Sequence, residues 1–234
     1  MKKSHIATLL VFFLLIPATL YIGTLLPGRG YYITGTLIIL ELMVPFFMAF
    51  EGRKPQARQL VTIAVMCAIA IVARVAIPIP NFKAIFAIIM LSGIAFGPES
   101  GFMVGAVSAL ASNFFYGQGA YTPWQMMAYG AGGMLAGLVF CKTKLPRKPL
   151  VLAVFGFLTT LLWIGPLLDS SHIFLMLTQV NTASVMAVFV SGFWVNLSQA
   201  CCSFLTMLLF GRPLLEKLDR VKLKYGFVEE EDGV

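Results

Sequence analysis

Polar and aromatic side chains gather in three connections between long apolar segments. These connections run over residues 77–83, 117–125 and 169–181, and they contain Asn, Gln, Tyr, Trp and Asp residues. Tyr and Trp can stack on a planar organic molecule, while Asn and Gln can pair with its polar edge. The residue types therefore indicate a ligand-binding site. The alternative is an aromatic belt at the membrane interface with ordinary turn residues.

Two ionisable residues lie inside apolar segments. Glu41 falls near the centre of the second segment and Arg74 in the final third of the third. A charge near the bilayer centre costs about 2.5–3.5 kcal/mol on insertion scales, so such residues usually face protein or water. Because the two segments are predicted to run antiparallel, a Glu41–Arg74 ion pair is one hypothesis. A protonated Glu41 is the other.

Motifs that would support catalysis are weak. His172 near Asp169 is a lone His–Asp pair without a nucleophile motif, and Gly117-x-Gly119 follows no strand and precedes no P-loop lysine. The spacing of the four cysteines matches no zinc or redox motif: Cys67, Cys141, Cys201 and Cys202. We therefore expect no enzyme activity, no metal and no cofactor.

The elements that position these residues are long apolar helices. Hydrophobic residues make up 59% of the 234-residue chain and charged residues 12%, whereas a soluble domain carries roughly a quarter charged residues. A spanning helix needs about 20 mostly apolar residues. The sequence thus predicts an all-α membrane protein with about eight transmembrane helices, over residues 6–26, 32–50, 59–78, 83–97, 101–116, 124–141, 150–168 and 183–210.

The distribution of basic residues predicts the orientation. With the N-terminus inside, all 17 basic residues except Arg29, Arg74 and Lys83 fall in cytoplasmic segments, as the positive-inside rule requires. We therefore expect a multi-pass protein of the cell membrane with both termini in the cytoplasm. The net charge of +7 then reflects topology and does not indicate nucleic-acid binding. Residues 216–224 are expected to form a short helix at the lipid interface, followed by a solvated acidic tail.

Small residues form two smooth helix faces. Gly101, Gly105 and Ala109 recur every four residues, and this spacing predicts close helix packing. Ala64 and Ala68 do the same in the third segment. Their face either packs inside the protein or receives another membrane subunit.

Several blocks of the sequence resemble the substrate-binding S components of energy-coupling factor (ECF) vitamin transporters. They are residues 97–106, 112–119, 121–126 and 130–137, together with the Ala64-x-x-x-Ala68 element, which resembles the family's docking motif. Among S components, these blocks most resemble the cobalamin type. The resemblance covers residues 59–211 and implies a six-helix binding core. Residues 1–58 would be a two-helix addition and residues 212–234 a charged cytoplasmic tail.

The resemblance implies that the protein captures a vitamin, cobalamin or a related corrinoid first, on the outer side of the membrane. A transmembrane coupling subunit and two ATPase subunits would then drive uptake. Ala64 and Ala68 would dock to the coupling subunit. The alternatives are a different vitamin or small planar nutrient, a stand-alone secondary transporter, a membrane enzyme and a scaffold. The family's ligand sites map onto residues of the three connections and nearby helix ends: Arg74, Asn81, Lys83, Asn113, Tyr116, Gln118, Tyr121, Thr122, Trp124, Gln125, Asp169 and His172, with Gln179 and Asn181 beside them.

Overall fold

The computed structural model describes residues 10–25, 30–52, 55–76, 78–143, 145–177 and 180–225. Within these ranges every regular element is helical, which confirms the predicted all-α fold. The elements are η1 (Val11–Leu15), α2 (Ile16–Leu25), α3 (Gly30–Gly52), α4 (Ala57–Val75), α5 (Ile85–Phe96), α6 (Pro98–Tyr116), α7 (Thr122–Lys142), α8 (Pro149–Thr159), η2 (Thr160–Ile164), α9 (Gly165–Met176), α10 (Thr182–Thr206), η3 (Met207–Gly211) and α11 (Arg212–Tyr225), where η marks a short π-helical stretch.

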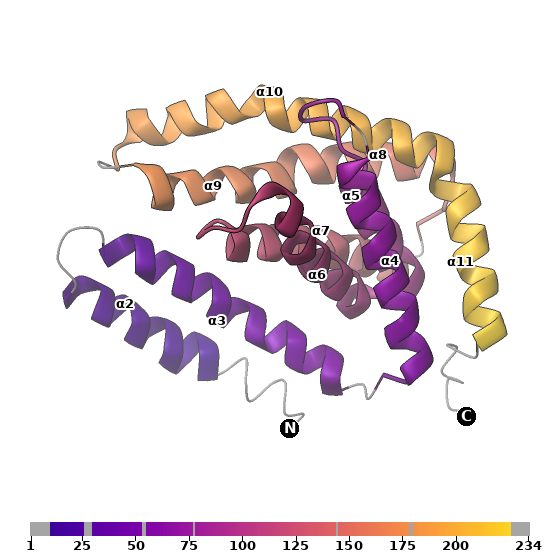
Figure 1. Cartoon of the computed structure of the whole chain (residues 1–234), viewed down its shortest axis with the longest axis horizontal. Helices are drawn as coiled ribbons and strands as arrows, with labels where there is room; N and C mark the ends of the chain where they lie inside the picture. The colour runs from indigo at the N-terminus through magenta and orange to yellow at the C-terminus, as the bar shows by residue number, and fades with distance from the viewer. Residues whose placement is uncertain are drawn as a thin grey trace.

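Most of the helices form three groups. Figure 1 shows α2 and α3 as an antiparallel pair on one side and α8, α9 and α10 on the opposite side, with α5, α6 and α7 between them. Every residue of α5 from Ile85 to Ala95 is buried. Its 12 residues rise about 18 Å, which is less than the roughly 30 Å of a hydrocarbon core. Helix α5 is therefore a core element that does not cross a bilayer by itself.

Glycines allow α5, α6 and α7 to approach closely. A Cβ atom added to Gly105 would lie 2.4 Å from the carbonyl oxygen of Tyr129, and one added to Gly101 would lie 2.5 Å from that of Gly133. A Cβ atom on Gly93 of α5 would also meet the Gly133 oxygen, at 2.0 Å. The Gly101–Gly105–Ala109 face thus packs against α7, as its spacing predicts.

Within the described part of the chain, four helical stretches have the length and apolar composition to cross a membrane. They are 33–52, 57–75, 149–176 and 182–224. Many large apolar side chains on these helices point outward, such as Val61, Leu162 and Val190. A helix that is apolar on all sides is buried in protein or lipid, so this surface fits a bilayer.

The helix predicted over 150–168 is longer than expected. Helices α8, η2 and α9 run on without a break to Met176, so Asp169 and His172 lie in a helix and only 177–181 connects it to α10. The polar run from Asp169 to His172 lowers hydropathy but does not break the helix, since the Ser170 and Ser171 hydroxyls donate to carbonyls three residues back. The predicted connection over 169–181 was therefore too long.

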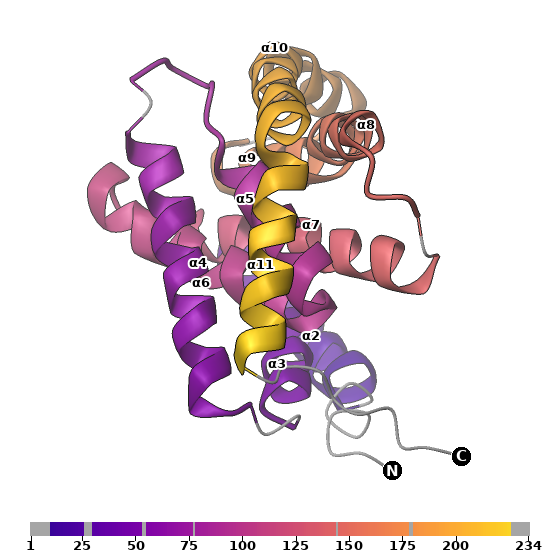
Figure 2. The same ribbon diagram turned by 90° about the vertical axis from the view of Figure 1, so that its right-hand side faces the viewer.

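Helix α11 confirms the predicted helix at the end of the chain. It turns away from α10 near η3 (Figure 2), where a π-helical stretch precedes Pro213 and both features bend helices. Leu215 and Leu218 are buried against the core cluster, while Lys217 and Arg220 are exposed. An amphipathic helix of this kind suits a membrane interface.

Candidate functional site

Asn113 is the centre of a polar cluster that joins α4, α6 and α7. Its side chain is fully buried. The amide oxygen accepts a hydrogen bond from Arg74 Nη1 at 2.9 Å, and the amide nitrogen donates to Gln125 Oε1 at 2.8 Å and to Thr122 Oγ1 at 3.2 Å. One amide thus satisfies both of its polar ends on two neighbouring helices. Such fully bonded buried networks fix the position of each member.

Arg74 carries the charge of this cluster. Its guanidinium also donates to Ser112, and it lies 4.8 Å from the ring centre of Tyr116 and 5.6 Å from that of Tyr129. Tyr116 donates to the carbonyl oxygen of Arg74 at 3.0 Å. Among the described residues no carboxylate pairs with Arg74. A half-buried cation is therefore held by neutral hydroxyl, amide and aromatic groups alone.

The proposed Glu41–Arg74 ion pair is not formed. Glu41 of α3 instead accepts a hydrogen bond from Thr19 of α2, within the N-terminal helix pair. Arg74 points toward α6 and α7, where Ser112 and Asn113 bind it. The antiparallel order of the two helices permits the ion pair, but their rotation and packing do not bring the side chains together.

The connection between α6 and α7 forms one wall of the cluster. Gly117 ends α6 with φ of +99°, a conformation that favours glycine. Gln118 accepts a hydrogen bond from Thr122 Oγ1 at 2.9 Å and donates to the Leu110 carbonyl at 2.9 Å. The Tyr121 hydroxyl donates to the Gly117 carbonyl at 2.6 Å. These bonds hold the connection against the end of α6.

Trp124 lies beside the cluster in α7 and faces α9 and α3. Its ring stacks on Phe174 of α9, with ring centres 5.1 Å apart, and Gly35 of α3 lies close to both rings. Trp124 is 7% exposed, and its indole nitrogen has no hydrogen-bond partner in the described residues. A buried donor of this kind is costly to leave unpaired.

Asp169 pairs with a residue that the sequence did not indicate. Its carboxylate accepts a hydrogen bond from the Asn196 amide of α10 at 2.7 Å, and both side chains are buried. Two glycines make room for the pair, since a Cβ atom on Gly192 would strike Asp169 and one on Gly165 would strike Asn196. His172, one turn further along α9, is exposed. This geometry holds α9 and α10 together.

The remaining candidates lie apart from the Asn113 cluster. Asn81 is exposed and adopts a φ of +55° in the connection between α4 and α5. Lys83 is half-buried at the end of the same connection. Asn181 caps α10 by accepting a hydrogen bond from the Ser184 amide. Gln179 and the acidic tail lie outside the described residues.

The side chains of the cluster suit the binding of a ligand. Seven of the predicted residues come together: Arg74, Asn113, Tyr116, Gln118, Tyr121, Thr122 and Gln125. They offer one cation, several amides and flat phenol rings, which suit a planar molecule with a polar edge. In the described part of the chain no group of His, Cys, Asp and Glu residues could hold a metal ion.

Comparison with models of protein families gives the decisive observation. Residues 54–218 match the family described as "ECF-type riboflavin transporter, S component". The chain belongs to this family of S components. No curated protein and no solved structure matches it.

Family membership confirms the expected S component, a membrane-embedded substrate-binding subunit of an ECF transporter for a vitamin. Its family is one of transporter components and not of enzymes. The match is to the riboflavin type and does not support the cobalamin type. Helices α2 and α3 precede the matched residues, although α3 packs against α6, α7 and α9.

The alanine face of this S component is open. Ala64 and Ala68 are exposed, and so are Val61, Val65 and Val72 on the same helix. The opposite face of α4, with Met66 and Ala70, is buried. Ala64 and Ala68 therefore do not pack inside the protein.

Sequence reasoning missed three residues of the site. Ser112 binds Arg74, Tyr129 lies under it, and Phe174 stacks on Trp124. Ser112 directly precedes Asn113, and Tyr129 lies one helical turn after Gln125 on the same face. Helical spacing could therefore have indicated both Ser112 and Tyr129. Phe174 carries no such signal, because its contact depends on how α9 packs on α7.

Proposed function

We propose that this S component binds a flavin, riboflavin first, at the Asn113 cluster. The observation that carries the proposal is the half-buried Arg74. Within the described residues, all of its partners are neutral. An intramembrane cation is a functional-site hypothesis by default. The name of the matching family supplies the ligand class.

The isoalloxazine ring of a flavin fits the side chains present. It is flat, and one edge alternates carbonyl oxygens with an imide N–H. The amides of Asn113 and Gln125 offer matching donors and acceptors, and the guanidinium of Arg74 can donate to a ring carbonyl. Tyr116 and Tyr121 supply apolar faces for stacking.

Binding requires an exchange of hydrogen bonds. In the described structure the Asn113 amide forms hydrogen bonds with Arg74, Gln125 and Thr122. A ligand that enters the cluster must replace at least one of these partners with an equivalent group, since an unpaired buried amide costs about 1–3 kcal/mol. Ligands that cannot pair at their edge are thereby rejected.

A corrinoid remains the competing ligand. The sequence blocks over 97–137 resemble cobalamin-type S components, but a corrin ring is much bulkier than isoalloxazine. The cluster is closed by direct side-chain bonds between α4, α6 and α7, which would all have to part for a macrocycle. A flat, narrow ligand needs a smaller rearrangement, which favours the flavin.

The topology and partners complete the proposal. The distribution of basic residues supports a topology with both termini and α11 in the cytoplasm, in which the α6–α7 connection faces outward and receives the vitamin. The exposed face around Ala64 and Ala68 docks to the transmembrane coupling subunit, which works with two ATPase subunits. Residues 59–211 form the binding core. Helix α3 covers it at α6, α7 and α9, and α2 packs on α3.

A ligand panel tests this function. The protein is purified in detergent, and the absorbance of co-purifying material is recorded before thermal unfolding is followed with riboflavin, flavin mononucleotide or cyanocobalamin. We expect riboflavin to raise the unfolding temperature and cyanocobalamin to leave it unchanged. Stabilisation by cyanocobalamin alone would refute the flavin and retain the S component.

A further inference from the structure

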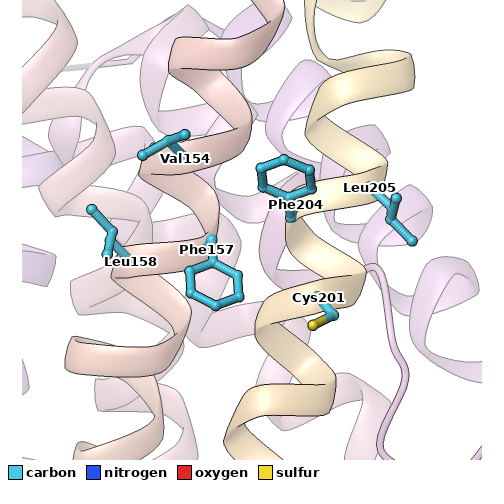
Figure 3. Close-up of a pocket in the computed structure, with 6 residues that line it drawn as sticks. All are labelled: Val154, Phe157, Leu158, Cys201, Phe204 and Leu205. Atoms are coloured by element: carbon cyan, nitrogen blue, oxygen red, sulfur yellow. The ribbon is translucent and has the colours of Figure 1, made fainter.

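An apolar groove lies between α8 and α10, away from the vitamin site. Its volume is about 420 Å³, and its walls are Val154, Phe157, Leu158, Cys201, Phe204 and Leu205 (Figure 3). Val154, Leu158, Cys201 and Leu205 are exposed, and no charged or amide side chain lines the groove. It is therefore shaped by two helices and lined only by apolar groups and one thiol.

A second hollow lies at the end of the same helices. It has a volume of about 340 Å³ and is lined by Arg147, Lys148, Arg212, Leu215, Glu216 and Asp219. Arg147 and Lys148 directly precede α8, and Arg212 begins α11, which continues α10 through η3. Three cations against two carboxylates leave this hollow with a net positive charge.

The cations of this hollow retain hydrogen-bonding capacity. Arg147 is paired with Asp219 at 2.8 Å, whereas Arg212 uses only its Nε, which donates to Glu216 at 2.9 Å. Within the described ranges Nη1 and Nη2 of Arg212 donate no hydrogen bond, and Lys148 forms no ion pair. Arg212 and Lys148 thus offer free donors to an oxyanion.

The spacing of the two hollows matches one lipid molecule. Val154 lies six residues beyond Lys148, about 9 Å along the helix, and Leu158 lies about 15 Å beyond it. Leu205 similarly precedes Arg212 by seven residues, about 10 Å. One leaflet of hydrocarbon is about 15 Å deep. A headgroup held at the basic hollow would therefore place its acyl chain at the depth of the groove.

We infer that this face binds an anionic phospholipid of the leaflet next to α11, with its phosphate at Lys148 and Arg212 and one acyl chain in the groove. The positive hollow selects a negatively charged headgroup, and the apolar groove selects a chain. This inference is independent of the flavin. With the proposed topology, the lipid belongs to the cytoplasmic leaflet.

Binding there would fix α11 relative to α8. The Arg147–Asp219 ion pair already joins the start of α8 to α11, and Arg147 also donates to the Ile94 carbonyl at the end of α5. A phosphate between Lys148 and Arg212 adds a second bridge between these segments. The lipid would thus stabilise the bend at η3.

Native mass spectrometry of the full-length protein tests the lipid site. Protein in detergent is titrated with phosphatidylglycerol or with phosphatidylcholine of the same chains, and retained adducts are counted. We expect preferential retention of phosphatidylglycerol, reduced about tenfold in K148Q/R212Q. The matched control K217Q/R220Q removes two exposed charges of α11 that do not line the hollow and should retain the lipid.

Filling the groove provides the second arm. V154W places an indole in the groove. L162W places one on the exposed surface about two turns further along, in η2, which continues α8. We expect V154W to lose phosphatidylglycerol and L162W to keep it. Equal retention of both lipids by the wild type, or loss of phosphatidylglycerol in neither K148Q/R212Q nor V154W, would overturn the inference. Displacement of the adduct by inorganic phosphate alone would show a free-anion site and would also overturn it.

Discussion

Arg74 of α4 donates a hydrogen bond to the buried amide oxygen of Asn113 in α6, at 2.9 Å. The same amide donates to Gln125 in α7, so a single side chain connects the cation to two helices. The cation has no carboxylate partner in the part of the chain that the structure describes. Its charge is thus available to a ligand.

Asn113→Asp should separate binding from folding. The carboxylate keeps the size of asparagine and can pair with Arg74, but it cannot donate to Gln125 and Thr122. We expect riboflavin affinity to fall at least tenfold, because the cation is neutralised. The unfolding temperature should change little, because the new ion pair with Arg74 offsets the two lost hydrogen bonds. Isothermal calorimetry and thermal unfolding measure the two effects.

Asn181→Asp is the matched control for that substitution. Asn181 is an exposed N-cap of α10, and aspartate caps a helix as well as asparagine does. It should leave both binding and stability unchanged. Unchanged riboflavin affinity in Asn113→Asp would show that the cluster is purely structural.

Because α6 and α7 lie so close together, we expect one added methyl group between them to lower the stability of the protein strongly. In Gly105→Ala the new Cβ would meet the Tyr129 carbonyl oxygen at 2.4 Å, and backbone on both sides leaves no flexible atom to yield. Overpacking of this kind costs about 1–3 kcal/mol. Gly52→Ala, where a Cβ meets nothing within 4 Å, should be neutral or slightly stabilising. Equal unfolding temperatures for the two variants would contradict this packing.

The Asp169–Asn196 pair predicts a stability effect without a binding effect. Asn196→Leu removes the donor at 2.7 Å and leaves a buried carboxylate unpaired, which should cost about 1–3 kcal/mol or more. Asp169→Asn keeps a hydrogen bond and should cost less. Both should bind riboflavin as the wild type does when measured well below their unfolding temperatures. Loss of affinity in Asp169→Asn would instead place Asp169 at the ligand.

The exposed alanine face predicts a transport defect with intact binding. A tryptophan at Ala64 or Ala68 projects from α4 into space that the coupling subunit would occupy. Uptake of labelled riboflavin by cells with the complete transporter should be lost, while the purified protein still binds the vitamin. Ala57→Trp, exposed at the start of the same helix, is the control and should transport. Normal uptake by Ala64→Trp would exclude this docking face.

Helix positions could be predicted well from the sequence. The expected segment 101–116 corresponds to α6, Pro98–Tyr116, because proline begins the helix and Gly117 ends it with positive φ. The helix predicted over 150–168 continues without a break to Met176, since hydropathy falls at Asp169 although the helical backbone continues. Hydropathy reports burial in lipid and not the end of a helix.

Side-chain partners were harder to predict. The residue types at Arg74 and Asn113 indicated a site, but the choice of Asn113 over Glu41 as the partner of Arg74 depends on the rotation of α4 toward α6. Trp124 similarly was expected to face a ligand and instead stacks on Phe174. Such contacts are set by packing between helices distant in sequence, which single-sequence spacing does not encode.

The most direct measurement is a riboflavin titration followed by flavin fluorescence, on the wild type, Arg74→Gln and Arg58→Gln. Arg58 is exposed at the opposite end of α4, so its loss matches the change in charge but not the site. Hydrogen bonds to a charged group contribute about 1.5–3 kcal/mol, so Arg74→Gln should weaken binding by roughly tenfold to a hundredfold, and Arg58→Gln should not. Equal affinities in all three proteins, or no riboflavin binding by the wild type, would contradict the account.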